Sequence, residues 1–292
     1  KRGRLVLKEN LGEENTLVRK EGRVHYSEVV IPLKREAHTP RPSLSGGESG
    51  DWACFKLYAA PGVIDQVLMT RLPKLVRMLK RSHGLLRWFY VRYHDSGPHL
   101  RLRFLLKETT AGAVGEALRN VLKTEIADHR VYRIVPDRYF PETGRYRNME
   151  LAEEIFFRDS EHTLELERLL PNPGRMGAAV QKIEAYLRAA GMNAHEQKRF
   201  CEQHRNTLLQ EQPNPKQALK SMNLFFREQS LAEPPLRFPR KLYQAVKKRK
   251  PEEEVLASLI HMSLNRLFIR DQRALEMLAY HLLFRKLRIP PG

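Results

Sequence analysis

Two arginines at alternate positions are the clearest candidates for chemistry in this chain. Arg101 and Arg103 lie in the run HLRLRF, where His99 shares their face and the apolar residues take the other. In a strand, side chains i and i+2 point to the same side and lie about 6.5–7 Å apart. Each guanidinium offers a planar fork of donors that matches a carboxylate or a phosphate. The pattern therefore indicates a site for an anionic ligand, although a solvated sheet face would have the same pattern.

Three further residues have the chemistry to complete such a site. Glu142 and Arg145 lie in the segment DRYFPETGRYRN, between a predicted strand and a predicted long helix, where an incidental surface ion pair is the alternative. His261 shares a helix face with Asn265, four residues later. Because histidine exchanges a proton near neutral pH, His261 is the candidate acid or base; a packed structural histidine is the alternative.

Local signatures of other chemistries are missing from the sequence. It contains no nucleophile elbow, phosphate loop or dinucleotide fingerprint, and His195-Glu196 does not open a zinc helix because Arg199 stands where a second histidine is needed. Cys54 and Cys201 are the only cysteines, so neither a disulfide framework nor a zinc site is indicated. We expect no metal and no cofactor.

The chain is strongly basic. Its 292 residues include 52 Lys and Arg against 34 Asp and Glu, a formal net charge of +18. This excess favours acidic partners, with nucleic acid as the first class to consider. The one dense basic run, residues 247–250, is followed by three glutamates, which is typical of a solvated loop entering a helix. The sequence shows no signal peptide or membrane-length apolar run, so we expect a cytoplasmic protein without a membrane partner.

The order of the predicted elements indicates an α+β fold. Alternating runs and helical spacing predict strand 52–59, helix 64–81, two strands within 86–104, helix 113–128 and strand 130–136. This β-α-β-β-α-β order is that of a ferredoxin-like, mostly antiparallel sheet. Pro73 should kink or divide the first helix. From residue 148 the pattern is nearly continuous helix, so we predict a sheet half at 52–147 and a helical half at 148–292.

The residues before this region have a different character. Residues 37–51 are rich in Pro, Ser and Gly, which predicts a linker or a mobile loop. Residues 1–36 begin in the middle of an apolar pattern and include a strand-like run at 23–33. We expect them to be the tail of an upstream domain.

Several ordered motifs resemble one family. The runs WFYVRYHDSGPHLRLRF, ETGRY, MELAEEIFFRDS and HMSLNRL are similar to the C-terminal domain of class I lanthipeptide dehydratases, which is shared with thiopeptide biosynthesis proteins. The resemblance covers nearly all of the chain from residue 52 onward. Residues 1–36 resemble the end of the glutamylating domain that precedes it in full-length dehydratases.

The resemblance implies a lyase. In that family, glutamate is transferred from glutamyl-tRNA to Ser or Thr of a ribosomally made precursor peptide, and the C-terminal domain eliminates it to leave dehydroalanine or dehydrobutyrine. The elimination residues fall, by resemblance, on Arg101, Arg103, Glu142, Arg145 and His261. The family usually has an acidic residue before the equivalent of Arg145 and Gly-Gly after the tyrosine. Here Gly144 precedes Arg145 and Arg147-Asn148 follows Tyr146. This difference affects the backbone of the loop and therefore the direction in which the Arg145 side chain points.

These residues suit the chemistry. Elimination needs a base for the α-proton and cations for the leaving carboxylate, so we expect the arginines to hold glutamate and His261 to act as acid or base. Glu142 would orient an arginine or the imidazole, or share the base role. Additional substrate contacts are expected from His99, Arg92, Asn265 and Arg266.

The implied partners are the precursor peptide and a glutamylating domain or protein that uses glutamyl-tRNA. The sequence leaves the oligomeric state open, and a homodimer is one option.

One alternative function is that of a pyridine-forming cyclase of thiopeptide pathways, an enzyme that resembles this family in fold but releases no glutamate. The other is a non-catalytic basic module that binds peptide or nucleic acid, with the +18 charge as its main feature.

Overall fold

The computed structural model describes residues 18–20, 23–25, 51–95, 97–107, 110–169, 174–228 and 238–288. The chain forms two compact units, Lys1–Ser45 and Gly46–Gly292. In the first unit, strands β1 (Val18–Lys20) and β2 (Arg23–His25) pair antiparallel. The rest of the expected upstream tail and residues 37–50 of the expected linker lie outside the described residues, whereas Asp51, expected to end the linker, begins strand β3.

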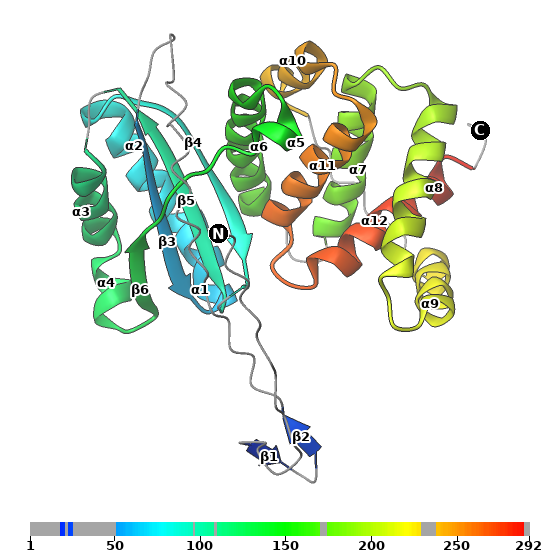
Figure 1. Ribbon diagram of the computed structural model, residues 1–292, viewed down its shortest axis with the longest axis horizontal. Helices are drawn as coiled ribbons and strands as arrows, with labels where there is room; N and C mark the ends of the chain where they lie inside the picture. Colours follow the sequence, from blue (N-terminus) through cyan, green and yellow to red (C-terminus); the bar gives the residue numbers. More distant parts are fainter. Residues whose placement is uncertain are drawn as a thin grey trace, which may run out of the picture. The chain divides into compact units, whose positions relative to one another are not determined.

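The second unit contains a four-stranded antiparallel sheet with the order β4-β5-β3-β6 (Figure 1). Its strands are β3 (Asp51–Ala59), β4 (Leu85–Tyr93), β5 (His99–Leu106) and β6 (Val131–Pro136). Helices separate β3 from β4 and β5 from β6 along the chain. The α+β class predicted from the sequence is confirmed.

Helices cover one face of this sheet. They are α1 (Pro61–Gln66), the π-helical turn η2 (Val67–Arg71), α2 (Leu72–Ser82), α3 (Ala111–Val121) and α4 (Lys123–Ala127). Pro73 is the second residue of α2 and directly follows the π-helical turn η2, so the predicted helix is divided into α1, η2 and α2 next to the proline. Leu100, Leu102 and Phe104 of β5 are buried in the core beneath these helices.

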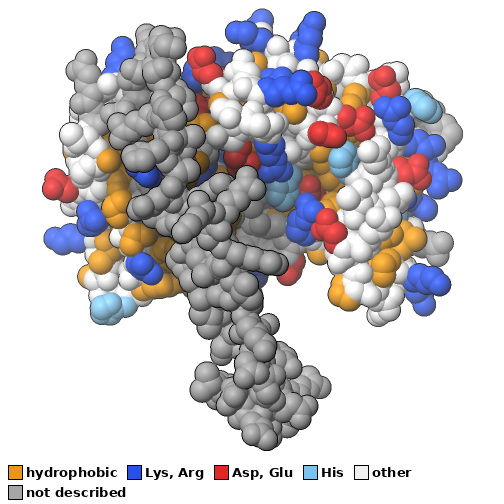
Figure 2. All heavy atoms as spheres, in the orientation of Figure 1, with side chains coloured by type: hydrophobic (Ala, Val, Ile, Leu, Met, Phe, Trp, Pro, Cys, Tyr) orange, Lys and Arg blue, Asp and Glu red, His pale blue; other side chains and the backbone are white. Residues whose placement is uncertain are grey.

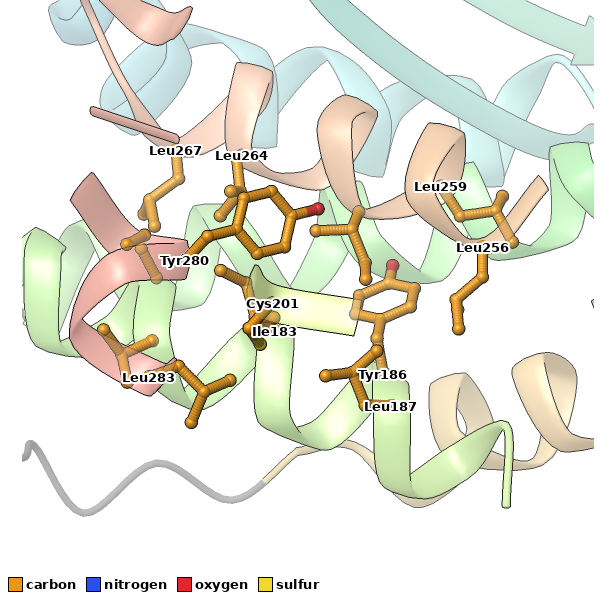
Figure 3. Packing of buried hydrophobic residues seen from close by; sticks show 14 of the residues in the cluster. Ile183, Tyr186, Leu187, Cys201, Leu256, Leu259, Leu264, Leu267, Tyr280 and Leu283 are labelled. Carbon is orange, nitrogen blue, oxygen red and sulfur yellow. The ribbon is translucent and has the colours of Figure 1, made fainter. Parts of the chain in front are cut away.

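Beyond the sheet, the chain is helical. The elements are α5 (Thr143–Tyr146), α6 (Met149–Leu169), α7 (Gly174–Ala189), α8 (Ala194–Gln210), α9 (Pro215–Glu228), α10 (Arg240–Arg249), α11 (Glu253–Leu267) and α12 (Gln272–Lys286). Tyr186 and Leu187 of α7 pack with Leu259 of α11 and Leu283 of α12 in a second core (Figure 3). No helix in the described part of the chain is long and apolar enough to span a membrane.

Edge strand β4 connects the two cores, because α6 and α11 pack against it (Figure 1). Phe89 and Val91 belong to the helical core, whereas Trp88 and Tyr90 belong to the core beneath α1–α4. Successive side chains of a strand point to opposite faces. Strand β4 is therefore buried on both faces, and the sheet face that carries Phe89 meets the helices.

Candidate functional site

The strand register places the predicted arginines on one face of the sheet. Across β4, β5 and β3 the rows are Phe89, Arg103 and Cys54; Val91, Arg101 and Lys56; and Tyr93, His99 and Tyr58. Directly opposite residues in a sheet project to the same side. His99, Arg101 and Arg103 therefore share a face, as their alternation predicts, opposite to the face covered by α1–α4.

The guanidinium of Arg103 packs against two aromatic rings. Its central carbon lies 4.5 Å from the ring centre of Tyr139 and 5.3 Å from that of Phe89. Within the described part of the chain it pairs with no carboxylate, and its buried Nε has no hydrogen-bond partner. Arg103 and Glu142 line a small cavity of about 20 Å³. The Arg103 charge is therefore available to an anionic ligand.

Arg101 is already engaged. Its Nη2 donates a hydrogen bond of 2.9 Å to Asp95 Oδ2, and its guanidinium lies 3.7 Å from the ring centre of Tyr93. Cation–π and ion-pair contacts of this kind reduce the donors that remain for a ligand. Arg101 therefore lies beside Arg103 on the same strand but has a carboxylate partner of its own.

Helix α5 positions Glu142 and Arg145. Arg145 Nη1 lies 3.4 Å from Glu142 Oε2, and Arg145 Nε donates a hydrogen bond of 2.9 Å to Ser258 Oγ on α11. Arg147 ends the helix with a φ of 51°, which a glycine adopts more easily than any other residue. Arg147 therefore adopts a backbone conformation suited to glycine. The bond to Ser258 still directs Arg145 toward α11.

His261 forms a hydrogen-bonded pair with a buried carboxylate. Its Nδ1 lies 2.7 Å from Oε2 of Glu276 on α12, a side chain that is 5% exposed, whereas the His261 side chain is 29% exposed. His261 and Arg145 together line a cavity of about 180 Å³, with Ser258, Arg273 and Glu276 in the same wall. This cavity brings an imidazole with a carboxylate partner next to two guanidinium groups.

Shared cavity walls and hydrogen bonds connect four of the five predicted elimination residues. Arg145 and His261 share the larger cavity, Glu142 pairs with Arg145, and Glu142 shares the smaller cavity with Arg103. Met262, the residue after His261, also lines the smaller cavity. Arg101, the fifth, lines neither cavity in the described part of the structure.

His99, predicted to contact substrate, is fully buried in the structure. Its ring lies 4.7 Å from that of Tyr58 and 5.8 Å from that of Tyr93, and its Nδ1 bonds the Gly97 carbonyl oxygen at 3.0 Å. Burial lowers the pKa of His99 below its ordinary value. Packing between two tyrosines encloses the ring, and the substrate contact named for His99 from the sequence stays a prediction.

The predicted contacts Arg92, Asn265 and Arg266 are buried as well. Arg92 donates from Nη2 to Glu167 at 2.8 Å and from Nε to the Arg266 carbonyl oxygen at 2.9 Å, and its Nη1 lies 2.7 Å from Asp65. All of its donor nitrogens are therefore occupied inside the protein. Arg92 thereby holds β4 against α1, α6 and α11, and the substrate contact named for it from the sequence stays a prediction.

Arg266 belongs to a second buried charge network, with Asp159 of α6. Arg266 Nη1 donates to Asp159 Oδ2 at 3.1 Å, and Arg266 Nε donates to the Tyr90 carbonyl oxygen of β4 at 2.9 Å. Burial by itself raises the pKa of Asp159, but the charges of Lys182 and Arg266 outweigh it and lower that pKa to about 2. The Arg266 side chain is fully enclosed, and the substrate contact named for it from the sequence likewise stays a prediction.

Sequence reasoning missed Glu276, Ser258 and Tyr139, all of which contact the predicted residues. A signal for Glu276 was present, since it is a lone acidic residue in the apolar run LEMLAYHLLF. Ser258 and Tyr139 carry no comparable signal.

Among the residues that the structure describes, no group of three or more His, Cys, Asp or Glu is placed to hold a metal ion.

Comparison with known sequences identifies relatives of this fold. The sequence model of the family described as "Lantibiotic biosynthesis dehydratase C-term" matches residues 52–287. Nisin biosynthesis protein NisB of Lactococcus lactis subsp. lactis is 27% identical over 157 residues, which are 52% of this chain. Subtilin biosynthesis protein SpaB of Bacillus subtilis is 29% identical over 149 residues, 46% of this chain. The chain spans only 14% of the length of each of these relatives.

Solved structures agree on the fold. The tRNA-dependent lantibiotic dehydratase MibB from Microbispora sp. 107891 matches with a TM-score of 0.55 and 19% identity, over 82% of this chain and 28% of MibB. The pyridine synthase TbtD from thiomuracin biosynthesis matches with a TM-score of 0.57 and 15% identity, over 81% of this chain and 97% of TbtD. With the family match extending over 52–287, this chain belongs to the family of C-terminal domains of lantibiotic biosynthesis dehydratases.

Proposed function

We propose that this chain is a lyase that eliminates glutamate from O-glutamylated Ser or Thr of a ribosomally made precursor peptide. The product is dehydroalanine from Ser or dehydrobutyrine from Thr. Membership of the dehydratase C-terminal family supports a role in dehydration. The observation that carries the finer proposal is the cavity in which His261, with its carboxylate partner, faces the same space as Arg145.

The elimination requires one base and at least one cation. His261 takes the α-proton, the C–H electron pair becomes the second bond between Cα and Cβ, and the Cβ–O bond breaks. The electron pair of that bond leaves on the glutamate carboxylate. Arg145, fixed by Ser258, lies in the cavity wall where the carboxylate charge develops, and a charge-assisted hydrogen bond stabilises that charge.

The other predicted residues have distinct parts in this proposal. Arg103 binds an acidic group of the glutamyl moiety, because its own charge has no carboxylate partner among the described residues. Glu142 holds Arg145 from the side of α5. Arg101 contributes more weakly, since Asp95 competes for its guanidinium.

The proposed reaction depends on a second activity. A glutamylating domain or protein that uses glutamyl-tRNA must supply the ester, and residues 1–36 are proposed to be the end of such a domain. The proposed precursor peptide is made by ribosomes, so we propose that the chain acts in the cytoplasm.

A pyridine synthase is the second candidate, because the fold of TbtD matches this chain along 97% of TbtD. A non-catalytic nucleic-acid module is less well supported. Among the described side chains visible in Figure 2, Lys and Arg are interspersed with Asp and Glu. Nucleic-acid binding usually relies on a basic stripe or patch.

One assay separates these functions. The chain is incubated with a synthetic peptide that carries O-glutamyl-Ser and, separately, with a peptide that carries two dehydroalanines. We expect mass loss of glutamate from the first peptide and no change in the second. Cyclisation of the second peptide without elimination from the first would favour the synthase. Salt-sensitive RNA or DNA binding with neither reaction would favour the binding module.

A further inference from the structure

A buried carboxylate on α12 faces the proposed base. The Glu276 side chain is 5% exposed, and its Oε2 lies 2.7 Å from His261 Nδ1 and 3.5 Å from Arg273 Nη1. Its neighbours Met277 and Tyr280 are packed in the helical core. A carboxylate in such surroundings needs charged or hydrogen-bonding partners, because an unpaired buried charge is strongly unfavourable. His261 and Arg273 supply them.

From this contact we propose that Glu276 is a positioning residue that determines which ring nitrogen of His261 exchanges a proton with the substrate. The proposal rests on the lyase activity proposed above. An ionised carboxylate only accepts hydrogen bonds, so Nδ1 must carry the hydrogen. The lone pair of the neutral ring then lies on Nε2, and no described residue hydrogen-bonds to that atom. Glu276 therefore leaves Nε2 as the basic atom.

The same contact stabilises the ring during the reaction. When Nε2 takes the α-proton, the imidazole becomes an imidazolium whose positive charge lies next to the Glu276 carboxylate. Arg273 Nη2 also donates to Glu211 Oε1 at 2.6 Å, so Arg273 is anchored on both sides. The carboxylate is thus fixed before the ring gains its charge, which is the arrangement that lowers the cost of reorganisation.

Glu276→Gln in the full 292-residue chain tests this role. The variant keeps the size of the side chain, but its amide can turn an N–H toward Nδ1 and favour the opposite tautomer. With ¹⁵N-labelled histidine, we expect the ring-nitrogen shifts of His261 to report Nδ1–H in the wild type and a shift toward Nε2–H in the variant. On the O-glutamyl-Ser peptide we expect kcat to fall by about 10²-fold, with KM near the wild-type value.

Glu202→Gln is the matched control, because Glu202 is an exposed carboxylate on α8 that lies 3.7 Å from Arg205 and contacts neither His261 nor Arg273 among the described residues. The control should leave the His261 shifts and kcat unchanged. A wild-type tautomer or a wild-type kcat in Glu276→Gln would overturn the positioning role. An inactive wild-type chain would contradict the lyase proposal instead, and the nitrogen shifts would then decide whether Glu276 sets the tautomer.

Discussion

The side-chain amide of Asn265 bonds both backbone groups of Arg92. Its Oδ1 accepts a hydrogen bond of 3.0 Å from the Arg92 N–H, and its Nδ2 donates one of 3.0 Å to the Arg92 carbonyl oxygen. Strand β4 is an edge strand, whose outer backbone groups would otherwise lack partners. One side chain of α11 therefore takes the place of a neighbouring strand and joins the helices to the sheet.

Removing this amide should destabilise the whole unit. In Asn265→Ala, two buried backbone groups lose their partners, and we expect the free energy of unfolding to fall by about 2–3 kcal/mol. Urea denaturation followed by circular dichroism measures the change. Asn206→Ala, at an exposed position of α8, is the control and should change stability by less than about 0.5 kcal/mol. Equal stability of the two variants would show that the Asn265 bonds contribute nothing.

Acid should destabilise the protein through His162. Burial, and then the charge of Lys182, lower the pKa of His162 to about 3, whereas the unfolded chain titrates near 6.5. The unfolded state therefore binds the proton first, so the stability present above pH 6.5 is lost as the pH falls toward 3. At about 1.4 kcal/mol per pH unit, the loss from this residue reaches about 2 kcal/mol at pH 5.

The variant His162→Leu isolates that loss. The free energy of unfolding of the variant, minus that of the wild type, should rise by about 2 kcal/mol from pH 7 to pH 5. Urea denaturation at each pH measures this difference. His195→Leu, at an exposed position, should show no such gain. If the difference between His162→Leu and the wild type were the same at both pH values, the buried histidine would not be the source of acid sensitivity.

The two arginines of β5 should differ in their effect on activity. In Arg103→Ala we expect kcat/KM for the glutamylated peptide to fall by about 10²-fold, which corresponds to the loss of one or two charge-assisted hydrogen bonds. In Arg101→Ala we expect kcat/KM to fall by only about tenfold, because Asp95 already engages Arg101. Steady-state kinetics by mass spectrometry compares them, with Arg119→Ala on α3 as the control.

A peptide with O-acetyl-Ser sharpens this test. Acetate lacks the charged groups of glutamate that Arg103 is proposed to hold. The Arg103→Ala variant and the wild type should therefore act on the acetyl peptide at similar rates. A defect of equal size on both esters would mean that Arg103 does not recognise glutamate.

Local sequence patterns predicted much of this molecule. Period-two alternation placed Arg101 and Arg103 on one sheet face, and Pro73 marked the division of the helix. The change of pattern near residue 148 corresponds to the start of α6 at Met149. These features depend on residues close together in the chain, and short-range geometry determines them.

The tertiary contacts were not predictable in this way. His99 alternates with apolar residues like a solvated side chain, and Arg92 follows an apolar run, but packing of the helices on β4 and of tyrosines on His99 buries both. Glu276 reaches His261 only because α11 and α12 are neighbours in the fold. Where an element packs decides whether a polar side chain is exposed, paired or buried, and the local pattern does not contain that information.

The most direct measurement follows glutamate loss from an O-glutamyl-Ser peptide by mass spectrometry, with the wild-type chain and His261→Ala in parallel. The proposed mechanism predicts that the wild type converts the peptide to its dehydroalanine form, while His261→Ala leaves the glutamylated peptide intact. His195→Ala, at an exposed histidine on α8, should match the wild type. Dehydration by His261→Ala at the wild-type rate would contradict the role of His261 as the base.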